Sequence, residues 1–96
     1  MNEQTLIELS RQASQLLAED AAKIRQLIEV QMENLATRKC PLYEEVLDTQ
    51  MYGLSREVDF VVRLGLVSEQ EGKDLLVELE RNLAQLYEAM EIKQSQ

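Results

Sequence analysis

Apolar residues recur every three or four positions along most of the chain, and this spacing predicts α-helices rather than strands. The first predicted helix covers about residues 5–36, a rod about 48 Å long. Its apolar face consists of Leu6, Leu9, Ala13, Leu16, Leu17, Ala21, Ile24, Leu27, Ile28 and Leu35. Such a face indicates a helix that packs against neighbours along its length.

Two polar residues, Asp20 and Gln31, interrupt this apolar face. We predict one continuous helix because no Gly or Pro divides it, although the weak pattern around Asp20 leaves a break into two helices open. A carboxylate inside a helix contact must be paired, protonated or metal-bound, and the simpler expectation is that Asp20 lies at the bundle edge and reaches water. Thr5 and Glu8 fit a capping box at the helix start, with Asn2 as the alternative N-cap.

The second predicted helix covers about residues 41–64, after a connection at residues 37–40. Pro41 suits its first turn, where a backbone N–H is not needed. Its apolar arc takes up about half the circumference and predicts contacts with two neighbouring helices. The arc contains Leu42, Tyr43, Val46, Leu47, Met51, Leu54, Val58, Phe60, Val61, Val62 and Leu64. Gly53 marks a kink or a close helix crossing, and Gly65 predicts a left-handed helix end with an apolar contact from Leu66.

The third predicted helix covers about residues 69–93 and opens with a capping box formed by Ser68 and Glu71. Its stripe consists of Leu75, Leu76, Leu79, Leu83, Leu86, Tyr87 and Met90. Three helices with short links predict an all-α fold, an antiparallel three-helix bundle that forms one domain over residues 1–96. The first helix is the longest, so its overhanging apolar residues need cover, either from the ends of the other helices or from a second copy of the chain.

The charge balance narrows the range of partners. The chain is 45% hydrophobic, and its ten basic and eighteen acidic residues give a net charge of −8. Residues 41–96 carry twelve of the acids and five of the bases. A nucleic-acid binder needs a basic surface, so direct nucleic-acid binding is disfavoured. An acidic surface suits a basic partner, a cation or simple solubility.

The residue inventory disfavours catalysis. The sequence contains no His, and Cys40 is its single cysteine, so a His-based triad, an imidazole acid–base pair and an internal disulfide are excluded. We therefore predict that the protein is not an enzyme. No apolar run reaches the length of a membrane span and the N-terminal residues lack a signal-peptide pattern, so we expect a cytoplasmic protein without membrane association.

An outward stripe on the second helix is the candidate partner surface. Its members, spaced by three or four residues, are Glu45, Asp48, Tyr52, Arg56, Asp59 and Arg63. A Tyr on the polar side of a helix is a good interface anchor because it offers a large area with few rotors. The alternative is an ordinary solvated face, in which Asp59 pairs with Arg56 and Arg63.

The candidate metal ligands are Cys40, Glu44 and Asp48, with Glu45 beside them. Glu44 and Asp48 are one helical turn apart, so their carboxylates share a face, and Cys40 precedes Glu44 by another turn. Carboxylate oxygens suit a hard divalent cation, and ferrous iron also accepts a thiolate. Pairs of acids at this spacing are common on acidic helices, and without His any such site is expected to be weak and exchangeable.

The run CPLYEEVLDTQMYGLSREVDFVVRLGLV, residues 40–67, resembles the YlaN family of small cytoplasmic proteins of Gram-positive bacteria. The likeness continues in EGKDLLVELERNL and KIRQLIEVQMENL and so covers most of the chain. The resemblance implies an all-helical fold and a role in iron homeostasis: binding of ferrous iron, and contact with the ferric uptake regulator that relieves its repression of DNA. An alternative remains open, a structural or homodimeric interaction module with only an indirect iron role.

Overall fold

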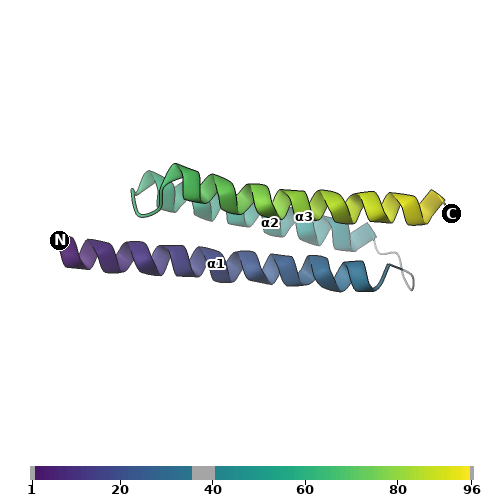
Figure 1. The fold of residues 1–96 in the computed structure, drawn as a ribbon, viewed down its shortest axis with the longest axis horizontal. Helices are drawn as coiled ribbons and strands as arrows, with labels where there is room; N and C mark the ends of the chain where they lie inside the picture. Colours follow the sequence, from purple (N-terminus) through teal and green to yellow (C-terminus); the bar gives the residue numbers. More distant parts are fainter. Residues whose placement is uncertain (1, 36–40, 96) are drawn as a thin grey trace.

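Three long helices form an antiparallel bundle, as the sequence pattern predicts (Figure 1). The computed structural model describes residues 2–35 and 41–95, with side chains at 2–35 and 44–92. The helices are α1 (Glu3–Glu33), α2 (Pro41–Arg63) and α3 (Glu69–Ser95). Each contacts the other two, in a molecule that measures 59 × 17 × 16 Å. None of the described helices is both long enough and apolar enough to cross a bilayer.

The first helix begins two residues earlier than predicted. Asn2 is its N-cap, and its Oδ1 accepts a hydrogen bond of 2.7 Å from the backbone N–H of Thr5. The capping box proposed for Thr5 and Glu8 is therefore wrong. Thr5 already lies inside the helix, and the Glu8 carboxylate instead accepts from the Arg11 guanidinium one turn later. α1 continues unbroken through Asp20, as expected for a segment without Gly or Pro.

Local backbone chemistry sets the turn between α2 and α3. Gly65 has φ +79°, and its N–H donates to Val62 O (2.9 Å) while Leu66 N–H donates to Val61 O (3.0 Å). These two bonds form the Schellman ending that Gly65 predicts. Ser68 then caps α3, because its Oγ accepts from Glu71 N–H at 3.0 Å. The chain therefore reverses within a few residues, and α2 and α3 lie side by side.

The core is a single apolar cluster between the three helices. Its buried members are Ala13, Leu17, Ala21, Ile24, Ile28, Leu47, Leu54, Val58, Val67, Leu79, Leu83, Leu86 and Met90. Full burial of one such large aliphatic side chain contributes about 1.5–3 kcal/mol. Gln31, which interrupts the apolar face of α1, is also buried. Leu42 and Tyr43 were also predicted for the apolar arc of α2, but their side chains are not among those that the structure describes.

Five side chains assigned to the apolar faces are exposed instead. Leu6 is 48% exposed, Leu16 59%, Val46 41%, Phe60 62% and Leu64 57%. Leu6 lies on the N-terminal part of α1, which extends beyond the α2–α3 turn (Figure 1). Leu16, Phe60 and Leu64 line an open groove between α1 and α2. The apolar arcs are therefore broader than the area that three helices cover.

The close helix approach occurs at Gly72 and not at Gly53. A Cβ at Gly72 would lie 2.6 Å from Val58 Cγ1 and 3.2 Å from Val62 Cγ2, whereas a Cβ at Gly53 has no described neighbour within 4 Å. The absence of a side chain at Gly72 thus lets the first turn of α3 pack against α2. The assignment of a close crossing to Gly53 is wrong, because this residue is on an exposed part of α2.

These two glycines provide a matched stability test. We expect Gly53→Ala to raise the free energy of unfolding by about 0.5–1 kcal/mol, because Ala is the better helix former. Gly72→Ala should lower it by about 1–3 kcal/mol, because the stiff valines resist the new methyl group. Urea denaturation followed by circular dichroism measures both. Stabilisation by both changes would contradict the close approach at Gly72.

Candidate functional site

The outward stripe of α2 is exposed, as its spacing predicts. Tyr52 is 69% exposed, and Glu45, Asp48 and Arg56 are exposed beside it. Asp59 is half-buried and pairs with two bases: its Oδ2 lies 3.7 Å from Arg56 Nη1 and 3.6 Å from Arg63 Nη1. The C-terminal part of the stripe therefore has one acid and two bases, a net charge of +1, and the negative charge of the stripe belongs to its N-terminal part.

Asp48 makes a tertiary contact that the sequence analysis missed. The Tyr87 hydroxyl of α3 donates a hydrogen bond of 2.8 Å to Asp48 Oδ1. Partial burial, followed by this bond and the charges of Asp48 and Glu44, raises the pKa of Tyr87 above its ordinary value. The phenol therefore remains a donor at neutral pH. The sequence does contain one chemical indication of this contact, because a Tyr in the apolar stripe of a helix needs a hydrogen-bond partner for its hydroxyl.

The structure shows only part of the candidate metal set. Glu44 and Asp48 are both exposed and one helical turn apart, so their carboxylates share one side of α2. Cys40 lies outside the described residues. Within the described segments, no three Cys, Asp or Glu side chains gather as a metal-holding group. The described part of the set is a pair of carboxylates, of which Asp48 accepts a hydrogen bond from Tyr87.

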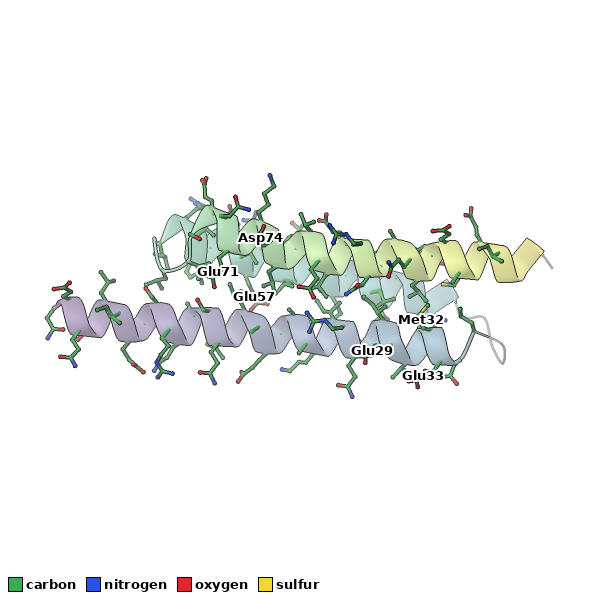
Figure 2. The ribbon with its side chains drawn as sticks, in the orientation of Figure 1. Glu29, Met32, Glu33, Glu57, Glu71 and Asp74 are labelled. Atoms are coloured by element: carbon green, nitrogen blue, oxygen red, sulfur yellow. The ribbon has the colours of Figure 1, made fainter. Side chains whose placement is uncertain are left out.

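A second carboxyl pair joins α1 to α2. Hydrogen bonding to Asp20, partial burial and the charge of Asp20 raise the pKa of Glu57, against the opposing charge of Lys23. Lys23 Nζ lies 3.6 Å from Asp20 Oδ1, and the Asp20 side chain is 34% exposed, so Asp20 is at the bundle edge as expected. Thr49 helps to line a polar cavity of about 270 Å³ at this pair. Figure 2 shows Glu57 between α1 and the other helices.

The larger cavity, of about 540 Å³, lies between α1 and α3. Arg25 and Glu78 line it, with Arg25 Nη2 3.5 Å from Glu78 Oε1. Glu29, Met32 and Glu33, labelled in Figure 2, line it towards the end of α1. Its lining mixes acidic, basic, amide and apolar groups without a common centre. The Arg25–Glu78 contact at this cavity is an ordinary surface ion pair, and the strongest candidate surface remains the stripe on α2.

The geometry defines a small acidic three-helix bundle with an exposed tyrosine on its second helix. Residues 8–92 match the model of a family described as "Protein of unknown function (DUF1507)", and the chain belongs to this family. It is 61% identical to a UPF0358 protein of Halalkalibacterium halodurans, over 93% of this chain and 96% of that protein. It is 57% identical to the UPF0358 protein YlaN of Bacillus subtilis, over 97% of this chain and all of that protein. The resemblance to the YlaN family is thus confirmed.

The Asp20–Glu57 pair predicts a pH dependence. The pKa of Glu57 is raised from its ordinary 4.5, so the folded chain holds this proton to higher pH than the unfolded chain. Its stabilising contribution is fully present below the unfolded pKa and is lost as pH rises through the folded pKa. Glu57→Gln cannot titrate, so its stability relative to wild type should improve between about pH 4 and about pH 7.

Urea denaturation at both pH values measures this difference. Glu45→Gln is the matched control, because it removes one carboxylate from the exposed stripe of the same helix. An equal pH-dependent gain in both variants would show that general charge repulsion, and not the Asp20 contact, is responsible.

Proposed function

We propose that this protein is a non-enzymatic iron-homeostasis protein that binds ferrous iron and docks on the ferric uptake regulator, thereby relieving repression of DNA. The iron role is the expectation attached to the YlaN resemblance, and family membership supports it. The observation that carries the docking role is Tyr52, which stands 69% exposed beside the acidic N-terminal part of α2. A large aromatic side chain held on a rigid helix loses little entropy when a partner covers it.

Electrostatics favours a DNA-binding protein as the partner. A repressor reads DNA with a basic surface, because it must neutralise phosphates. Residues 41–96, which contain α2 and α3, hold twelve acids and five bases, so this half of the chain attracts a basic surface. Docking there competes with DNA for the same positive charge. The proposed mechanism is therefore occlusion of the DNA-reading face, weakened by salt in the same way as DNA binding.

The proposed iron ligands are Glu44, Asp48 and Cys40. Two carboxylates one turn apart present oxygen ligands, and a thiolate is acceptable to ferrous iron. The hydrogen bond from Tyr87 holds Asp48 Oδ1 and so fixes the orientation of that carboxylate, as partners of metal ligands commonly do. The small number of protein ligands makes the binding weak and exchangeable, which suits a protein that responds to changing iron levels.

The docking surface is tested by binding to the purified, iron-loaded regulator. We expect Tyr52→Ala to weaken binding at least about tenfold, as for a hot-spot aromatic residue. Glu45→Lys should weaken it through the on-rate, and rising salt should weaken the wild-type complex. Ile92→Ala and Glu29→Lys are the matched controls, because they make similar changes at exposed sites on α3 and α1. Wild-type affinity in both α2 variants would exclude this docking surface.

The metal site is tested by anaerobic titration with ferrous iron. Wild type should saturate near one ion per chain, Asp48→Asn and Cys40→Ser should weaken binding, and Tyr87→Phe should weaken it less because it removes only the orienting hydroxyl. Asp74→Asn on α3 is the control for loss of one carboxylate. Unchanged affinity in all three variants would exclude these ligands. No binding by wild type would leave the structural or homodimeric module as the better account.

A further inference from the structure

The two ends of the outward stripe on α2 carry opposite charges. Glu45 and Asp48 make its N-terminal end acidic. At its C-terminal end, Arg56 and Arg63 outnumber Asp59. We infer that the docked partner is bipolar in the complementary sense: its basic DNA-reading surface lies over the acidic end, and a carboxylate just beyond that surface lies over the two arginines. This arrangement rests on the proposed docking on α2 and adds the direction in which the helix lies on the regulator.

The two ends are far enough apart to act on a partner separately. At a rise of about 1.5 Å per residue, the middle of the Glu45–Asp48 pair lies about 20 Å along α2 from the middle of the Arg56–Arg63 pair. Salt at physiological concentration screens exposed charges over about 8 Å, so the acidic end does not cancel the charge of the arginines for a group in contact with them. A partner that covers Tyr52, which lies between the two ends, therefore meets two local charges rather than one net charge.

The arginines keep hydrogen-bonding capacity for a partner. Arg56 Nη1 and Arg63 Nη1 lie 3.7 and 3.6 Å from the same oxygen, Oδ2 of Asp59. Both distances are longer than an N–H···O hydrogen bond, and the two arginine side chains are 60% and 73% exposed. One carboxylate thus faces two guanidinium groups, each of which has several N–H donors. A carboxylate on the partner can make the short, bidentate contact that Asp59 does not make.

Helix stability accounts for only one of these arginines. Arg63 lies in the last turn of α2, where a cation interacts favourably with the helix dipole. Arg56 lies in the middle of the helix, beyond the range of that effect. Its contact with Asp59 is an exposed ion pair, of a kind that contributes little to stability. Arg56 therefore places a positive charge one helical turn from Tyr52, where a docked partner covers it.

A uniformly basic partner surface does not fit this stripe. A surface that reads DNA is positive where it contacts phosphates, so it attracts Glu45 and Asp48 but repels Arg56 and Arg63. Like charges held together in an interface cost affinity, whereas opposite charges favour association. The repulsion is avoided when the arginines extend past the edge of the DNA-reading surface and face a carboxylate there. α2 therefore docks in one direction, with its N-terminal end over that surface and its C-terminal end outside it.

Charge reversal at the arginines distinguishes a bipolar partner from a uniformly basic one. Arg56→Glu and Arg63→Glu should each weaken binding to the purified, iron-loaded regulator about five- to tenfold, because repulsion replaces an exposed attraction. A uniformly basic partner would instead bind both variants more tightly. The loss should shrink in high salt, and circular dichroism should show intact helices. Arg81→Glu is the matched control, because it makes the same charge change at an exposed site on α3.

The outcomes separate this arrangement from the docking on which it rests. Stronger or unchanged binding by both arginine variants, with Tyr52→Ala still weakened, overturns the bipolar arrangement and leaves the docking surface in place. An equal change in Arg81→Glu shows an effect of net charge and overturns it as well. Wild-type affinity in Tyr52→Ala and Glu45→Lys removes the docking surface itself, and the bipolar arrangement with it.

Zero-length cross-linking tests for the carboxylate on the partner. A carbodiimide joins a carboxylate to an amine in contact with it as an amide and takes up the water released. In the complex of the Arg63→Lys variant, the new amine should be joined to an Asp or Glu of the regulator, and peptide mass spectrometry identifies the link. Arg81→Lys on α3 should give no such link. Links from position 63 to acids of its own chain alone would contradict the proposed carboxylate.

Discussion

The bundle depends on one apolar seam along α1, formed by Leu17, Ala21, Ile24 and Ile28, which are all buried. Their spacing of four, three and four keeps them on one side of the helix, where α2 and α3 pack against them. This packing decides which side of every helix faces outward. It leaves the acidic stripe of α2 in solvent, and it leaves Leu6 and Ile7 exposed on the N-terminal turns of α1.

Most of the fold could be predicted because its determinants are local. Gly65 supplies the left-handed residue of the α2–α3 turn, and Ser68 supplies the cap that follows it, so both act within a few residues of themselves. The exposure of Leu16 and Phe60 could not be predicted in this way. Periodicity shows that a side of a helix is apolar, but only the position of the neighbouring helices shows whether that side is covered.

In the candidate site, too, the features set within one helix could be predicted and those set between helices could not. The exposure of Tyr52 and the pairing of Asp59 with Arg56 and Arg63 result from spacing within one helix, and both were predicted. The contacts between Tyr87 and Asp48 and between Asp20 and Glu57 join residues from different helices, far apart in sequence. They depend on the register between helices, which the period of the sequence does not specify. Such contacts set the orientation of Asp48 and the surroundings of Glu57.

The acidic N-terminal part of α2 is the surface proposed for a basic regulator. The assignment of the regulator to α2 is the central claim, because the proposed relief of repression depends on it. Hydrogen exchange of this protein, with and without the iron-loaded regulator, tests that claim most directly. The account predicts slower exchange at residues 44–59 when the regulator is added. Protection confined to the N-terminal half of α1, with α2 unchanged, would contradict it.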